Sequence, residues 1–328
     1  MNAYISEKIK VLSLLAIWGV LFIHSQVPCS LNSFAGLFQN IIVGFSRFAV
    51  PFFFVISGFL FFLKGDSLFD YFLKQKKRIR TLLLPYLCWC LIFILIIFFV
   101  NKIVELNSDY FMLLNNGDYF DFFKYVFLTP AAFHLWYIRD LMVLVVISPL
   151  IGYFLRKNSY ITLSLGLIFT ISFWGKNFIP SGVLFYCLGA YYAIKKKYLF
   201  GDISNRISII LLLGASVVIV VTSYMNITIN NHVEPIITTM LVIGLWGIYN
   251  YLDNFYSRKL LMFADCTFFI YCAHIPLLMI IKKILYPTLI SGEVGVIICF
   301  VLSPLICMAV LLWISGIARK KLLRYINY

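Results

Sequence analysis

Long, almost uninterrupted apolar stretches recur along the whole chain, and they limit its possible folds more than any other feature. A helix needs about 20 mostly apolar residues to cross the hydrocarbon core of a bilayer. The sequence predicts ten such spans, near 11–29, 39–63, 82–100, 136–155, 159–174, 180–194, 207–225, 235–252, 265–281 and 294–316. A β-barrel would instead show short segments that alternate between apolar and polar residues. We therefore expect an all-α, polytopic membrane protein.

Composition supports this class. Hydrophobic residues make up 62% of the 328 residues and charged residues only 12%, about half the charged share of a soluble domain. The fifth and sixth stretches are short, so a re-entrant hairpin is an alternative to two spans there. No repeat or compositional break divides the chain, which predicts one integral membrane domain over 1–328. The eight cysteines lack paired metal-ligand spacing, so neither a metal site nor a disulfide framework is expected.

The distribution of basic residues predicts the orientation. Of the 27 Lys and Arg residues, 20 fall on the side of the N-terminus and five on the other side, while Arg47 and Arg139 lie at span ends. Basic loops are typical of the cytoplasmic face, so both termini are expected in the cytoplasm. The positive charge thus reflects topology, and no nucleic-acid partner is expected. Because no small-residue cleavage site follows the first stretch, we expect an uncleaved first helix and not a signal peptide.

Ionisable groups inside spans are costly in a membrane, so each is a candidate for function. His24 lies past the middle of the first span, toward its outer end. A packing histidine that bonds to a neighbouring helix is the alternative. Arg47 opens the second span from the outer side. Pro51, Ser57 and Gly58 follow it and predict a kink and a close helix contact.

Two later segments add polar groups at similar depth. His134, Trp136, Arg139 and Asp140 lie together where the fourth span begins. An interfacial anchor belt is the alternative there, although such belts rarely need an adjacent Arg-Asp pair. His274 lies near the middle of the ninth span. The concentration of these groups at middle-to-outer depth predicts a buried polar cavity.

A basic run on the cytoplasmic side, Lys74-Gln75-Lys76-Lys77-Arg78-Ile79-Arg80, leads directly into the third span. Clustered Lys and Arg side chains suit the phosphates of a polyanionic cofactor. Topology alone, or binding to anionic lipid headgroups, is the alternative. On the outer side, the loop near 101–135 is acidic and aromatic. Such a loop suits carbohydrate, and an amphipathic segment lying on the membrane has the same composition.

Five sequence blocks, in order, resemble acyltransferase family 3, whose members are ten-span inner-membrane enzymes that O-acylate extracytoplasmic glycans. They are Trp18–His24, Val50–Phe59, the basic run ending in Leu84-Pro85-Tyr86, His134–Tyr137 and Phe269–His274. The resemblance implies transfer of an acetyl group from cytoplasmic acetyl-CoA to a hydroxyl of a surface polysaccharide or lipid-linked sugar outside. It also implies a multi-pass protein of the bacterial inner membrane.

The resemblance also assigns roles to residues. His24 matches the essential histidine of the family, and the run from Lys77 through Arg78 to Arg80 matches its coenzyme-binding basic motif. An arginine often precedes the histidine by eleven residues, and here that position is Ser13, with Lys10 one turn earlier as a substitute. The remaining candidates, expected to contact the acceptor or stabilise the oxyanion, are Arg47, His134, Trp136, Arg139 and His274.

Two other functions remain open. A membrane transporter of a small or glycan-related solute would also combine many helices with a polar centre. It would favour two related halves with helices broken at matching places, and only the second span shows a Pro-Ser-Gly interruption. A structural or regulatory membrane protein without the activity is the third possibility, because Ser13 departs from the family pattern.

Overall fold

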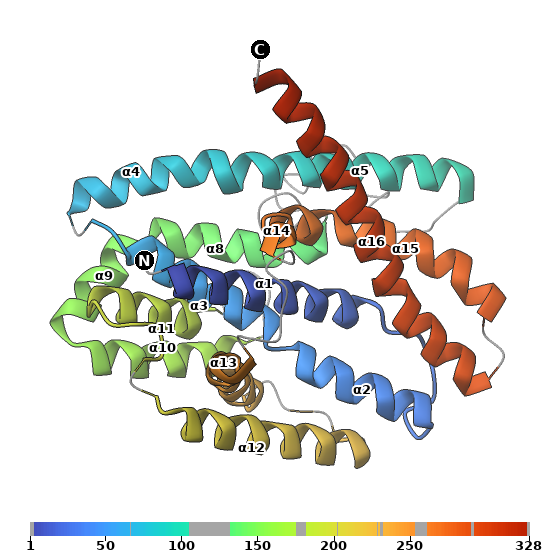
Figure 1. Ribbon diagram of the computed structural model, residues 1–328, viewed down its shortest axis with the longest axis horizontal. Coiled ribbons are helices and arrows are strands. Elements are labelled where there is room, and N and C mark those ends of the chain that lie inside the picture. Colours follow the sequence, from blue (N-terminus) through green and yellow to red (C-terminus); the bar gives the residue numbers. More distant parts are fainter. Residues whose placement is uncertain are drawn as a thin grey trace. The chain divides into compact units, whose positions relative to one another are not determined.

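The computed structural model describes residues 3–65, 67–104, 132–174, 182–201, 203–227, 229, 232–252, 261–289 and 292–326. These residues form helices and connecting turns, and no strand occurs among them (Figure 1). The chain divides into two compact units, one of Met1–Phe53 with Phe200–Tyr328 and one of Phe54–Leu199. The all-α expectation is thus confirmed, while a single domain over 1–328 stays a prediction.

The first unit gathers helices from both ends of the chain. They are α1 (Ala3–His24), α2 (Phe34–Ser46), the start of α3 (Ala49–Phe62), α12 (Asn205–Tyr224), α13 (Glu234–Leu252), α14 (Leu261–Ala264), α15 (Thr267–Leu289) and α16 (Gly292–Ile326). α12 packs along α13 and α15 along α16, and α1 contacts α2, α15 and α16. An apolar cluster that includes Val27, Ala35, Val43 and Phe300 fixes the end of α1 against α2 and α16.

The second unit holds the rest of α3 and the middle of the chain. Its other helices are α4 (Leu68–Arg78), a π-helical turn (Ile79–Leu83), α5 (Leu84–Val104), a 3-10 turn (Phe133–Leu135), α8 (Trp136–Val146), α9 (Ser148–Lys157), α10 (Ser159–Phe173) and α11 (Val183–Ile194). Two glycines let α3 and α11 cross closely. A Cβ at Gly58 would lie 2.1 Å from the carbonyl oxygen of Tyr186, and one at Gly189 would lie 1.9 Å from that of Val55. The close contact predicted around Gly58 is therefore confirmed.

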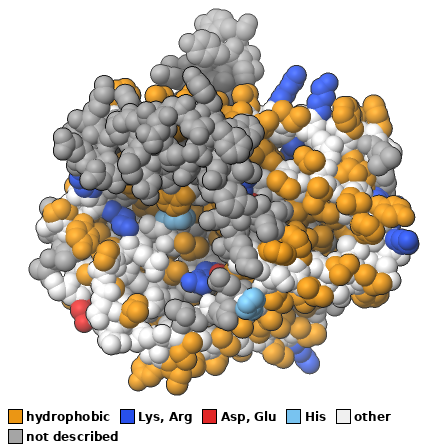
Figure 2. Space-filling view, turned by 180° about the vertical axis from the view of Figure 1, so that it is seen from behind, with side chains coloured by type: hydrophobic (Ala, Val, Ile, Leu, Met, Phe, Trp, Pro, Cys, Tyr) orange, Lys and Arg blue, Asp and Glu red, His pale blue; other side chains and the backbone are white. Residues whose placement is uncertain are grey.

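Five helical segments in the described chain are long and apolar enough to cross a membrane: Phe34–Phe62, Phe69–Ile96, Asn205–Tyr224, Thr267–Pro287 and Gly292–Gly316. Phe133–Val146 and Ser148–Lys157, bent by 61°, make a sixth if they count as one span. Ser159–Phe173 and Val183–Ile194 are shorter apolar helices. Hydrophobic side chains cover much of the described surface in Figure 2, as lipid-facing surfaces require. The chain is thus a multi-pass membrane protein, while ten spans and the orientation of the termini stay predictions.

The first two predicted spans have different ends in the structure. α1 ends at His24, whereas the predicted span continued to residue 29. Pro28 favours this early end, because proline has no N–H to donate and disfavours a helical conformation of the residue before it. The second span begins at Phe34 and not near residue 39, because the hydroxyl of Ser33 accepts the N–H of Gly36 at 3.0 Å and starts the helix there. Arg47 therefore lies near the middle of this span, in the break between α2 and α3, and not at its outer end.

Candidate functional site

His24 is the last residue of α1, and three side chains hold the chain just beyond it by hydrogen bonds. The hydroxyl of Ser25 donates to the carbonyl of Leu21 at 2.6 Å. The buried amide of Gln39 accepts the Val27 N–H at 2.8 Å and donates to the Val27 carbonyl at 3.2 Å. Lys282 on α15 donates to the carbonyl of Gln26 at 2.5 Å. The half-buried His24 ring is therefore carried on a fixed helix end.

His274 lies beside His24, with the two ring centroids 5.2 Å apart. The side chain of His274 is fully buried on α15, and its Nδ1 is 2.6 Å from the carbonyl oxygen of Tyr271. A carbonyl only accepts, so Nδ1 is the donor in this contact. The structure thus brings two of the predicted site residues together, and it fixes the ring of one of them by a backbone contact.

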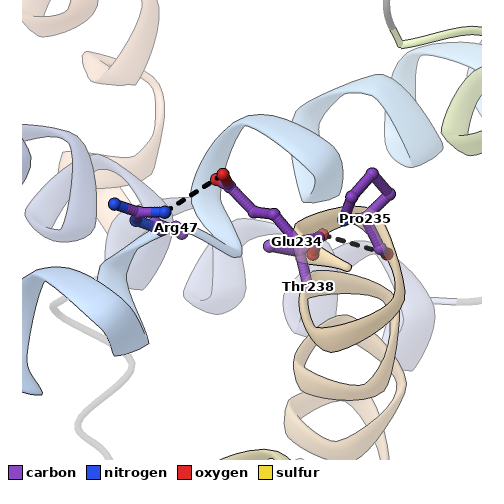
Figure 3. A network of polar contacts seen from close by, with 4 residues as sticks. All are labelled: Arg47, Glu234, Pro235 and Thr238. Atoms are coloured by element: carbon purple, nitrogen blue, oxygen red, sulfur yellow. Dashed lines mark hydrogen bonds and ion pairs between the residues drawn. The ribbon is translucent and has the colours of Figure 1, made fainter. Parts of the chain in front are cut away.

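Arg47 is paired with Glu234, as Figure 3 shows, with Nη1 and Oε2 3.0 Å apart. Arg47 follows the C-terminus of α2, and Glu234 is the first residue of α13. The helix dipole stabilises a positive charge at a C-terminus and a negative charge at an N-terminus, so both side chains lie at favourable helix ends. Thr238 donates to the carbonyls of Glu234 and Pro235, at 2.9 and 3.1 Å, and tightens this first turn of α13. The Arg47 charge is therefore balanced inside the first unit.

The basic residues near the start of α1 differ sharply in environment. Lys10 forms an ion pair with Asp265 at 3.4 Å, and both side chains are about half exposed. Lys8 is only 2% exposed. Its Nζ donates to Asn250 Oδ1 at 2.7 Å and lies 4.4 Å from the centre of the Trp246 ring, a cation–π contact. Sequence reasoning counted Lys8 only as a topology signal, and no pattern around it indicated that it would be buried.

The basic run lies on the end of α4 and the start of the π-helical turn after it. The first turn of α4 is fixed by a capping box. The Ser67 hydroxyl accepts the Asp70 N–H at 3.0 Å, and the Asp70 carboxylate accepts the Ser67 N–H at 3.1 Å. Lys74 donates to the carbonyls of Phe61, Lys64 and Gly65 and so closes the end of α3. Lys77 and Arg80, by contrast, are exposed. The run therefore divides into a structural lysine and cations that remain accessible to a ligand.

A glutamine from the same run supports the bend between α8 and α9. Pro149 has no N–H, so it cannot donate to the Val145 carbonyl one turn earlier. The side-chain amide of Gln75 donates to the carbonyls of Val145 and Val146 instead, at 3.0 Å each. α4 is thereby tied to the bent helix pair. Sequence reasoning treated Gln75 only as part of the basic run.

Arg78, unlike Lys77 and Ile79 on either side of it, is half-buried. Its charge interacts with the phenolic groups of Tyr137 and Tyr186. Tyr137 is hydrogen-bonded to Ser57 at 3.1 Å and Tyr186 to Ser148 at 2.8 Å. These hydroxyls were not predicted as site residues, and only Ser57 was singled out, for packing.

The predicted cluster at the start of the fourth span occurs in the second unit as three separate contacts. His134 is buried in the 3-10 turn, with its ring centroid 5.8 Å from that of Phe93. The Trp136 ring centroid is 6.4 Å from that of Phe54. Arg139 donates to one carboxylate oxygen of the buried Asp140 through Nε at 2.9 Å and Nη2 at 2.6 Å. The charge of Arg139 is thus largely neutralised by its neighbour.

The candidate residues therefore fall into two groups. Lys10, His24, Arg47 and His274 belong to the first unit, and the other candidates belong to the second: Lys77, Arg78, Arg80, His134, Trp136 and Arg139. A single polar cavity formed by all of them stays a prediction. The acidic, aromatic loop near 101–135 falls almost entirely outside the described residues. Within the described part of the chain, no group of three or more His, Cys, Asp or Glu side chains is arranged to hold a metal.

Comparison with known proteins adds an independent result. A family model described as an acyltransferase domain matches residues 7–313 and so runs through both units. The succinoglycan biosynthesis protein ExoH of Rhizobium meliloti (strain 1021) is 26% identical over 352 residues, which cover 98% of this chain and 90% of that protein. No solved structure matches the chain.

Proposed function

The chain belongs to acyltransferase family 3, and on this premise we propose that it is a membrane O-acetyltransferase. Acetyl-CoA supplies the acetyl group from the cytoplasm. The acceptor is a hydroxyl of a surface polysaccharide or a lipid-linked sugar on the outer face. ExoH is named for succinoglycan biosynthesis, which supports a glycan acceptor. The proposal includes a location in the bacterial inner membrane, with ten spans and both termini in the cytoplasm.

The observation that carries the proposal is the pair of imidazoles at the end of an apolar helix. An alcohol is a weak nucleophile until a base takes its proton, and imidazole does so near neutral pH. His24 is half-buried beside the fully buried His274. Two adjacent imidazoles suit proton transfer better than a purely packing role, which an apolar side chain would fill without the cost of burying a polar ring.

In the proposed step, the acceptor oxygen bonds to the thioester carbonyl carbon while its proton passes to His24. The C–S bond of the tetrahedral intermediate then breaks, and the proton passes from His24 to the coenzyme sulfur. His24 is positively charged between these events. Because it ends α1, the partial negative charge at the helix C-terminus stabilises that state. His274 positions the His24 ring by packing beside it, with the ring centroids 5.2 Å apart.

The coenzyme phosphates are assigned to Lys77, Arg78 and Arg80. Lys77 and Arg80 are exposed, and Arg78 is half-buried. Guanidinium groups bind phosphate through paired, charge-assisted hydrogen bonds. Lys10 is a weaker candidate, because Asp265 already partners its ammonium group.

The direct test of the function is the acetyl content of the surface polysaccharide. Mass spectrometry of polysaccharide from cells with the gene, without it, and with it restored should show O-acetyl groups that disappear and return. Equal acetyl content in all three strains would contradict the proposal. Unchanged polysaccharide yield in the deletion strain would separate a modifying enzyme from an exporter, whose loss would instead reduce the amount of polymer outside the cell.

Substitutions in the basic run are expected to weaken coenzyme use selectively. Lys77→Gln and Arg80→Gln should each raise the KM for acetyl-CoA about tenfold, as expected when one hydrogen bond to a charged group is lost. The kcat should change little, because the phosphates are remote from the reacting thioester. Steady-state kinetics of purified protein in nanodiscs measures both constants. Lys157→Gln, an equal charge change at the exposed end of α9, is the control. An equal rise in KM in that variant would show that only net charge matters.

A further inference from the structure

A groove with both polar and aliphatic lining residues opens in the first unit between α2, the C-terminal end of α12 and the loop after α1. Its polar lining residues are Gln26, Asn40, Arg47, Thr222, Ser223 and Asn226, and aliphatic residues such as Leu31 and Ile227 complete the wall. On α2, positions 40, 43, 44 and 47 follow the spacing of one helix face. The groove is thus built by one face of α2 and the facing end of α12.

The packing of α2 on α12 limits one side of this groove. A Cβ at Gly44 would lie 2.6 Å from Cγ2 of Ile219, so a larger residue there would require the Ile219 side chain or the two helices to shift. Near the end of α12, Asn226 has a positive φ of 54°, a conformation that asparagine tolerates well. Its amide donates to Asn32 Oδ1 at 2.7 Å. The groove wall is therefore a defined structure made by specific residues.

The groove is electrically almost neutral. Arg47 is its charged lining residue, and the Glu234 carboxylate 3.0 Å away offsets that charge. The other polar lining groups are hydroxyls and carboxamides, which both donate and accept hydrogen bonds. Aliphatic side chains lie between them. This combination favours an uncharged ligand with many hydroxyls and some apolar surface over an acidic ligand or a lipid phosphate.

The groove lies close to His24 along the chain. Gln26, which lines it, is two residues beyond His24, so their Cα atoms are at most about 7 Å apart. The same segment is held by Gln39 and Lys282. At the far end, Arg47 is 13 residues beyond Phe34, which corresponds to about 20 Å along a helical path. The groove therefore lies along the second half of α2 and beside the segment that follows His24, while His24 itself is not among its lining residues.

We propose that this groove binds a neutral sugar residue of the acceptor glycan and presents its hydroxyl to His24. The inference rests on the proposed acetyl transfer and extends it by naming the acceptor subsite and the class of sugar. Amide and hydroxyl groups bind the sugar hydroxyls, and Val43, Ile219 and Ile227 contact the apolar face of the ring. Arg47, held by Glu234, adds hydrogen bonds without attracting an acidic sugar.

The test uses the full-length protein in nanodiscs and de-acylated surface polysaccharide from the deletion strain as the probe. Asn40→Leu and Thr222→Val remove polar groups at nearly constant volume, and Ser223→Ala is the milder third variant. The control is Thr239→Val, because Thr239 and Thr222 both donate to the carbonyl four residues earlier, at 2.6 and 2.7 Å. Thr239 does not line the groove. Acetyl transfer and direct binding of the polysaccharide are both measured.

Each groove variant is expected to raise the KM for polysaccharide about fivefold, the effect of one lost hydrogen bond, with the KM for acetyl-CoA unchanged. The direct-binding constant should weaken equally. If the groove variants match the control in both measurements, the groove proposal is overturned and the acetyltransferase function stands. If wild-type protein binds polysaccharide through the groove but transfers no acetyl group, the proposed function fails and the groove is supported. Displacement of the polysaccharide by phospholipid, with no effect of the variants, would also overturn the groove proposal.

Discussion

His24→Ala is expected to lower kcat by about 100- to 10,000-fold, the range attributed to a general base. The substitution removes the group proposed to accept the hydroxyl proton, while binding of acetyl-CoA should be nearly unchanged. Cells that express the variant at the wild-type level should make polysaccharide without O-acetyl groups. Steady-state kinetics in nanodiscs and mass spectrometry of the polysaccharide measure these two effects.

The structure provides a matched control for this substitution. His232→Ala removes an exposed imidazole just before α13 and should leave kcat within about twofold, as expected of a surface site outside the reaction.

His274→Ala should lower kcat less than His24→Ala does, because His274 positions the His24 ring but does not take the proton. Its loss should also change the pH profile of kcat, which a purely structural residue would not. Retained acetylation by His24→Ala would place the chemistry at another residue.

Gly189→Leu is expected to abolish the folded protein. Even a Cβ at this position would lie 1.9 Å from the Val55 carbonyl oxygen and 2.7 Å from the Phe59 nitrogen. Both are backbone atoms, so α3 and α11 would have to separate to admit the side chain. Overpacking typically costs about 1–3 kcal/mol, and a forced shift of two helix backbones is expected to exceed that range. Helices in membranes rely on such small-residue contacts because no hydrophobic effect holds them together.

The amount of monodisperse protein extracted from membranes, and its thermal unfolding temperature, measure this effect. Gly189→Ala should lower the unfolding temperature, and Gly189→Leu should leave no extractable protein. Gly316→Ala on α16 is the control, since a Cβ there meets no atom within 4 Å, and it should match the wild type. Normal yield and unfolding temperature for Gly189→Leu would show that α3 and α11 do not cross at this point.

The apolar stretches were sufficient to predict a helical membrane protein, but not where helices begin and end. Those ends depend on single polar groups such as the Ser33 hydroxyl, which starts α2, and the Gln75 amide at the bend near Pro149. A hydropathy average over about 20 residues does not detect the effect of one such polar group on a helix end. Arg47 was misplaced for this reason, because the early start of α2 moves it from the end of a span to its middle.

The candidate site was predicted residue by residue but not as an arrangement. His24 and His274 were identified because an ionisable side chain inside a span is rare. Their proximity depends on how α1 packs on α15, which are far apart in sequence and carry no pattern that specifies their contact. Lys8 and Gln39 were missed because polar residues near span ends usually contact water. Their burial becomes evident only when their partners, Asn250 and the Val27 backbone, are placed.

The π-helical turn at Ile79–Leu83 joins the cationic α4 to the apolar α5 within one continuous helix. Its hydrogen bond from the Leu84 N–H to the Ile79 carbonyl encloses one more residue than an α-turn does. One extra residue rotates every later side chain by about 100° around the axis. The turn thus rotates the side chains of α5 relative to those of α4. Lys77, before the turn, is exposed, while Tyr86 and Cys90, after it, are buried. A relative lacking one residue here would have to reorient either its charges or its core.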